Sequence, residues 1–340
     1  WKERRNLAVE WFHALKRIRP ALHLDEVLLS AYPDVGSNNA DLPEFGKVIK
    51  GQLPASAEEL SKTGEARTFL DIFRNTQVIL APTQYSTTAP LKVAAAKYGF
   101  RAATMPGFSS QMIPTLKLDY GEVNRRVLLL KEKLDRAQGA DVHFCVDNDE
   151  DFAVYFDLRF RMAHASTGRF PDKGTAGNLP SGEAYIVPYE GDMGEESRTE
   201  GMLPVQIRDD IVLFSIKKNR AVGVEGLVPA ILEEKAHLER EPAYGNMAEL
   251  GFGVLADFGI LPVNKILLDE KLGFHVAFGR SEHFGGAVGP KDFSAPEEVV
   301  HLDRIYIPAT QPRITVKSLV LLYEESQGEI ILENGKYLIF

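Results

Sequence analysis

A single histidine, His275, lies in the apolar run FHVAF (274–278), which has glycine on either side and is typical of a buried strand. An imidazole inside a sheet needs a polar partner, because a buried nitrogen without one is costly. That partner is either an ordinary hydrogen bond or a metal ion, since neutral imidazole is a common metal ligand. The answer depends on which other side chains the fold brings to His275.

A second histidine is followed by an acid two positions later, in His301-Leu302-Asp303. Residues two apart in a strand point to the same face, so this imidazole and this carboxylate would lie side by side. Such a pair suits a divalent metal ion of borderline hardness. The alternative is a histidine with a purely structural role next to a surface aspartate, which would have the same sequence pattern.

Two glutamates stand next to glycine-rich turns. Glu183 ends the turn GNLPSG and opens an apolar strand, and Glu249 precedes Gly-Phe-Gly (251–253), which allows close backbone approach. Each is either a metal ligand or an ordinary carboxylate at the end of an element. Glu282 and His283 lie in the glycine-rich loop that follows the His275 strand, where a functional loop and a solvated loop are both possible.

These patterns, in the order LPSGE, AELGFG, DEKLGFHVAFG and HLD, resemble the M29 family of metallopeptidases, the aminopeptidase T type. The resemblance covers about residues 70–340 and is weaker in its N-terminal part. It implies a homodimeric enzyme acting on a peptide or another small molecule. It also implies the metal ligands Glu183, Glu249, His275, His301 and Asp303.

One position departs from that family. Seven residues after the strand histidine the family has a tyrosine, and this chain has Glu282. The chain therefore lacks a phenol that could donate a hydrogen bond to the developing oxyanion. Lys265 or Arg280 could stabilise the oxyanion instead. A related group resembles 2,5-dihydroxypyridine dioxygenase and lacks the glutamate of LPSGE. Resemblance to this group implies one iron ion, which His275, His301 and Asp303 would hold in this chain.

The charge of the implied ligand set separates these alternatives. Three carboxylates and two neutral imidazoles carry −3, so one divalent ion leaves −1, whereas two ions and a bridging hydroxide reach neutrality. Because buried net charge is costly, this count favours a two-ion hydrolase. We therefore expect a metal-dependent aminopeptidase with two Zn, Co, Mn or Mg ions, in which Glu249 or Glu282 transfers protons. The alternatives are an Fe(II) ring-cleaving dioxygenase and a binding protein without turnover.

The N-terminal part that must support this site shows strand and helix signals in alternation. Residues 26–32 and 77–82 are typical of strands, a helix is predicted between Thr87 and Gly99, and residues 101–105 predict another strand. Strand, helix and strand within about 30 residues predict a parallel pair. A long helix follows at 121–139. We expect an α/β domain over residues 1–142.

After residue 142 strand signals dominate. Asn334-Gly335 between two apolar runs predicts a two-residue hairpin turn, and one helix is expected at 227–240. We therefore expect an α+β, mostly antiparallel metal-binding domain over residues 143–340. Its predicted strands span residues 152–158, 183–190, 211–218, 264–270, 274–279, 316–324 and 329–340.

Composition limits the remaining possibilities. The 340 residues are 44% hydrophobic and 26% charged, as in globular proteins of one or two domains. A net charge of −9 argues against nucleic acid and an anionic membrane as partners. The single cysteine, Cys145, excludes an intrachain disulfide and a thiolate zinc site, and we expect a reducing, cytoplasmic location.

Overall fold

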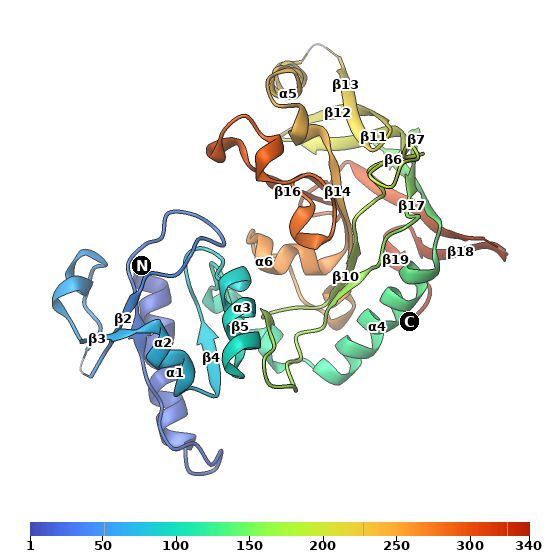
Figure 1. The fold of residues 1–340 in the computed structure, drawn as a ribbon. Helices are drawn as coiled ribbons and strands as arrows, with labels where there is room; N and C mark the ends of the chain where they lie inside the picture. Colours follow the sequence, from blue (N-terminus) through green and yellow to red (C-terminus); the bar gives the residue numbers. More distant parts are fainter. Residues whose placement is uncertain (51, 227, 325) are drawn as a thin grey trace. The chain divides into compact units, whose positions relative to one another are not determined.

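The structure, a computed structural model, describes residues 1–50, 52–226, 228–324 and 326–340 (Figure 1). By internal contacts the chain divides into two compact units. Unit 1 comprises Trp1–Leu118 and Gly168–Ser181, and unit 2 comprises Asp119–Thr167 and Gly182–Phe340. The predicted boundary at residue 142 falls inside strand β6 (Gly139–Val146), which pairs on both sides with strands of unit 2.

Unit 1 contains two small sheets. One is antiparallel and is built of β1 (Ser30–Ala31), β2 (Phe45–Val48) and β3 (Glu65–Thr68); the other is parallel, in the order β4 (Val78–Ala81), β5 (Arg101–Thr104) and β9 (Ala176–Asn178). Helix α3 (Thr88–Tyr98) connects β4 to β5, so the predicted strand-helix-strand unit is present. Only β1 forms within the predicted strand 26–32. The remaining helical segments are α1 (Lys2–Ile18), η1 (Glu58–Lys62), α2 (Phe69–Arg74) and η2 (Ser110–Lys117).

Unit 2 contains an eight-stranded antiparallel sheet. Asn334 and Gly335 have φ angles of 48° and 74°, so they form the predicted two-residue turn between its last two strands. The strands follow in the order β13 (Arg220–Glu225), β12 (Asp210–Lys217), β11 (Glu200–Ile207), β7 (Glu150–Asp157), β6, β17 (Ile314–Tyr323), β18 (Ser326–Glu333) and β19 (Lys336–Tyr337).

A second sheet of unit 2 has five antiparallel strands. In order they are β16 (His301–Ile305), β15 (Phe274–Gly279), β14 (Met247–Gly253), β10 (Glu183–Ile186) and β8 (His164–Ser166). Side chains alternate between its two faces. Phe278 of β15 packs on Phe214 of β12, with ring centroids 5.0 Å apart, so one face is buried against the eight-stranded sheet. The other face is free to carry polar groups.

The helices of unit 2 follow the predictions in two cases and differ in one. Helix α4 (Tyr120–Arg136) forms at the predicted helix 121–139 and buries Val123, Val127, Leu130 and Leu134. Helix α5 (Pro229–Arg240) lies within the predicted helix 227–240, of which residue 227 lies outside the described residues. The predicted strand 264–270 is wrong, because this segment contains the short helix α6 (Ile266–Asp269). The Asp269 carboxylate accepts hydrogen bonds from the Val263 and Lys265 amides at 2.9 and 3.2 Å, which folds the chain into a turn.

The fold is thus a mixed α/β one, with a small parallel sheet, larger antiparallel sheets and helices. Within the described parts of the chain, none of the helices has the length and apolar character needed to cross a membrane. Short 3₁₀ segments complete unit 2: η3 (Pro242–Gly245), η4 (Leu255–Phe258), η5 (Glu270–Leu272), η6 (Glu282–Phe284), η7 (Pro290–Asp292) and η8 (Pro296–Glu298).

Candidate metal centre

The five predicted metal ligands lie on neighbouring strands of the five-stranded sheet. Their positions in the strands alternate with apolar residues such as Val276 and Phe278, so their side chains share the polar face. Strand pairing places Ala277 opposite both Glu249 and Asp303, and Gly279 opposite His301. Small residues therefore separate the functional side chains and leave them room to meet.

Ligand atoms of the five residues approach one another closely. The His301 Nε2 atom lies 3.0 Å from the Glu249 carboxylate and 3.5 Å from Asp303, as expected for residues two apart in a strand. The His275 Nε2 atom lies 3.4 Å from Glu249 and 3.9 Å from Glu183. Two groups have ligand atoms all within 4.8 Å of one another, and they share Glu249: Glu183, Glu249 and His275; and Glu249, His301 and Asp303.

Glycine at position 251 makes this approach possible. A Cβ atom on Gly251 would lie 1.9 Å from the Nε2 atom of His275, so the imidazole lies directly over the bare backbone. A Cβ atom on Gly253 would lie 2.2 Å from the carbonyl carbon of Lys271. The Gly-Phe-Gly run thus serves the close approach for which its sequence is suited.

Both imidazoles place their Nδ1 atoms against backbone carbonyl groups. The distances are 3.3 Å from His275 to the Gly273 oxygen and 2.7 Å from His301 to the Arg280 oxygen. A neutral imidazole that donates from Nδ1 carries a lone pair on Nε2. Both Nε2 atoms face the Glu249 carboxylate, so acceptor would face acceptor unless a proton or a metal ion lies between. The arrangement requires a cation.

The pKa shifts caused by charge and burial show the same requirement for a cation. Burial alone lowers the pKa of His275, but the hydrogen bond and charge of Glu249 outweigh it and raise this pKa to about 9. Burial likewise lowers the pKa of His301, and Asp303 and Glu249 raise it well above its usual value. Burial raises the pKa of Glu249, but hydrogen bonds from both imidazoles leave it far below its usual value. Without a metal ion, protons supply the positive charge.

We expect the metal-free protein to lose stability as the pH rises from 6.5 to about 9. The pKa of His275 is about 9 in the folded chain and 6.5 in an unfolded one, so the folded state binds more protons between these values. Its stabilising contribution is complete below pH 6.5 and is lost as the pH rises through 9. Excess Co²⁺ should make the dependence weaker or reverse it, because a metal ion binds deprotonated imidazole. Urea unfolding at pH 6, 7.5 and 9 measures the stability of the protein with chelator and with Co²⁺. The same pH dependence in both samples would contradict the prediction.

Sequence reasoning missed a buried cation next to this cluster. The Lys271 ammonium contacts the carboxylates of Glu183 and Glu270, and its side chain is only 2% exposed. Burial lowers the pKa of Lys271, but the two carboxylates outweigh it and raise the pKa above its usual value. The Oε2 atom of Glu183 is buried without a hydrogen-bond partner. Lys271 directly follows the acids of the DEK sequence, which was the available signal.

Aromatic rings border the cluster. Tyr185, two residues after Glu183, stacks on His164 with ring centroids 5.1 Å apart and contacts Phe284 at 4.7 Å. Phe284 and His283 lie 5.4 and 5.1 Å from the His301 ring. Burial, followed by the charges of Glu249 and Glu183, raises the pKa of the Tyr185 phenol above its usual value. Tyr185 therefore keeps its proton at neutral pH.

Glu282 belongs to neither group of close ligand atoms. Its carboxylate pairs with the Arg280 guanidinium at 2.7 and 3.1 Å, and 42% of its side chain is exposed. The hydrogen bond from Arg280 lowers the pKa of Glu282. The side chain of Arg280 is thereby engaged as well, and the proton transfer by Glu282 stays a prediction.

Comparisons with known proteins identify a related fold. No protein-family model matches the chain. No curated protein matches it either. Among solved structures, the 2,5-dihydroxypyridine dioxygenase from Pseudomonas putida KT2440 matches with a TM-score of 0.56 and 14% identity, over 91% of this chain and 82% of that chain. At this identity the likeness establishes a shared fold.

This comparison corrects the expected enzyme class. The sequence favoured a hydrolase of the metallo-aminopeptidase type, whereas the matching structure is that of a dioxygenase, an oxidoreductase. The charge count that favoured two ions is incomplete, because it left out Lys271 and Glu270, whose ammonium and carboxylate contact each other next to Glu183. What the chain and its structural relative share is the fold, and the chain itself carries a set of side chains able to bind a metal ion.

Proposed function

We propose that this protein is a mononuclear non-haem Fe(II) dioxygenase that opens a dihydroxylated aromatic ring. The observation that carries the proposal is the contact between Lys271 and Glu183, which leaves a donor set for one ion. Two imidazoles and a carboxylate with further positions open are the ligands typical of Fe(II) oxygenases. The assigned ligands are His275, His301 and Asp303.

The local charges fit one divalent ion. Glu249 and Asp303 together carry −2, which a single divalent ion balances. Lys271 supplies one positive charge to Glu183 and Glu270 together, and burial raises the pKa of both carboxyl groups, that of Glu183 to about 7. A second ion near Glu183 would meet the ammonium of Lys271 at contact distance, and like charges in a buried site repel strongly. Both Nε2 atoms are turned toward Glu249 by hydrogen bonds at Nδ1, and Glu249 joins the two groups of close ligand atoms to which His275 and His301 belong.

The side chains around the ion have separate parts in the proposed reaction. When bound, iron would supply the activation of dioxygen. Glu249 lies between the two imidazoles and is the carboxylate best placed to take the proton of a substrate hydroxyl group. Tyr185 keeps its phenol proton and can donate a hydrogen bond to a substrate oxygen. Burial of Glu183, Glu249 and His275 limits access of water to that part of the cluster.

The ring contacts support an aromatic substrate. A continuous series of rings runs from His164 through Tyr185 and Phe284 to His301. Such rings favour planar aromatic molecules, which stack on them or meet their edges. The structural relative is named for its action on 2,5-dihydroxypyridine, which makes this compound the first to test.

Metal loading combined with oxygen uptake tests the proposal. We expect protein stripped with chelator and loaded with Fe(II) without air to bind one ion per chain. It should then consume one O₂ per ring opened with 2,5-dihydroxypyridine or another dihydroxylated ring. Zn-loaded protein is the control and should be inactive, because zinc has no redox chemistry. Two ions per chain, or an Fe-loaded protein that consumes no O₂ with any such ring, would refute the proposal.

A further inference from the structure

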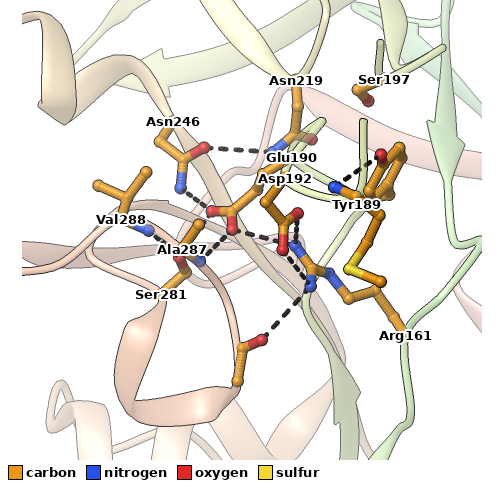
Figure 2. Close-up of polar contacts among 12 residues, drawn as sticks. Arg161, Tyr189, Glu190, Asp192, Ser197, Asn219, Asn246, Ser281, Ala287 and Val288 are labelled. Atoms are coloured by element: carbon orange, nitrogen blue, oxygen red, sulfur yellow. Dashed lines mark hydrogen bonds and ion pairs between the residues drawn. The ribbon is translucent and has the colours of Figure 1, made fainter. Parts of the chain in front are cut away.

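A second buried carboxylate, Glu190, lies outside the metal cluster, and its side chain is 4% exposed. Figure 2 shows the groups that converge on it. Its Oε1 atom accepts from Asn246 Nδ2 at 2.7 Å and from Ser281 Oγ at 2.6 Å. Its Oε2 atom accepts from Arg161 Nη2 at 3.2 Å and from the backbone amide of Ala287. One carboxylate thus binds both ends of the same loop.

The loop is 280–289, which follows β15. It closes through the Ser281 amide, which donates to the Val288 carbonyl at 2.9 Å. Asn246 also donates to the Gly279 carbonyl at 3.0 Å, and Arg161 to the Gly285 carbonyl at 3.4 Å. Ser281 and Glu190 together fill the inside of the loop, because a Cβ atom on residue 286 would lie 2.2 Å from the Ser281 Oγ atom and 2.8 Å from the Glu190 Oε2 atom.

This loop touches the candidate ligand His301 from several sides. The Arg280 carbonyl accepts from His301 Nδ1 at 2.7 Å, and the rings of His283 and Phe284 pack on the imidazole. The Phe284 carbonyl also meets His164 Nε2 at 2.9 Å. The loop therefore sets the direction of the His301 ring and covers one side of the cluster.

We propose that Glu190 is a positioning residue that holds the loop 280–289 closed against His301, and that it thereby slows release of the metal ion. The effect on ion release rests on the proposed function, because it requires an ion at the cluster. The negative charge matters, because four donors, one of them the Arg161 guanidinium, share two oxygen atoms. An amide at this position offers one acceptor oxygen and brings two competing donors.

Hydrogen exchange and ion release of Glu190→Gln test the proposal. We expect the Ala287 amide to exchange at least about 10-fold faster, and Co²⁺ to pass to a chelator about 10- to 100-fold faster, the range of partners that orient metal ligands. The visible absorption of bound Co²⁺ should also change, since the His301 ring turns. Glu241→Gln is the matched control, because Glu241 is also a buried carboxylate and accepts from the Ser294 amide and hydroxyl groups at 2.8 and 2.6 Å, outside this loop.

A milder variant guards against loss of folding. Ser281→Ala removes one bond to Glu190, and we expect the same changes at smaller size. Folded Glu190→Gln with wild-type amide exchange, ion release and Co²⁺ spectrum would overturn the proposal; if that variant does not fold, the same result for Ser281→Ala would do so. If wild-type protein binds no Co²⁺, the proposed function fails, whereas amide exchange still decides whether Glu190 closes the loop.

Discussion

His301→Ala is expected to lower the affinity for Co²⁺ or Fe(II) by at least about 1,000-fold, which is roughly 4 kcal/mol. His301 is the imidazole that approaches both Glu249 and Asp303, at 3.0 and 3.5 Å. Its loss removes one of two nitrogen donors and leaves two carboxylates facing each other. The remaining ligands are mostly carboxylates, which are hard oxygen donors. They therefore favour hydrated magnesium or calcium over iron. Competition with a chelating dye measures the affinity, and any turnover should disappear with it.

The design of this experiment separates lost ligation from lost folding. His143→Ala is the control, because His143 lies in β6 with about half of its side chain exposed and only a 3.8 Å contact with Asp141. It should bind the ion as the wild type does. Added imidazole should restore part of the affinity of His301→Ala, because the vacated space lies beside Glu249. Full ion content in His301→Ala would remove this residue from the proposed ligands.

The convergence of the candidate ligands was expected from the resemblance to the M29 metallopeptidases, and local rules account for part of it. The two-residue spacing of His301 and Asp303 requires a common face once the segment is a strand, and the structure has that strand. Gly251 was recognisable as a position of close backbone approach. What the spacing could not show is which strands are neighbours, because β10, β14 and β15 pair across long stretches of chain. The family resemblance carried by the order of the motifs supplied that expectation.

The errors came from groups whose surroundings are set by distant parts of the chain. The apolar run 264–270 is compatible with strand or helix, and the bonds to Asp269 decide for a helix. Lys271 looks like a surface lysine in the sequence, yet it reaches Glu183, 88 positions earlier. The charge count was incomplete for that reason: it included the ligands and omitted both Lys271 and the second carboxylate that Lys271 contacts, Glu270.

Lys271→Met is expected to lower the stability of the metal-free protein by about 3–5 kcal/mol, the usual effect of breaking a buried ion pair by removing one partner. Methionine keeps most of the side-chain volume, so the loss reports charge more than packing. It leaves the buried carboxylates of Glu183 and Glu270 without their ammonium. Adding Glu183→Gln should recover much of the loss, and the double-mutant cycle measures the coupling. Lys317→Met, at an exposed pair with Asp151, is the control and should change stability by less than about 1 kcal/mol.

The same variant decides how many ions the cluster accepts. With Lys271 gone, Glu183 can join Glu249 and His275, whose ligand atoms already lie within 4.8 Å of one another. Lys271→Met should therefore take up close to two Co²⁺ per chain where the wild type takes up one, and the ions should restore stability that the metal-free variant lacks. The double variant with Glu183→Gln should return to one ion. Two ions in the wild type would show that the ammonium of Lys271 is compatible with a neighbouring divalent ion. One ion in Lys271→Met, with unchanged stability, would show that Lys271 does not limit the site.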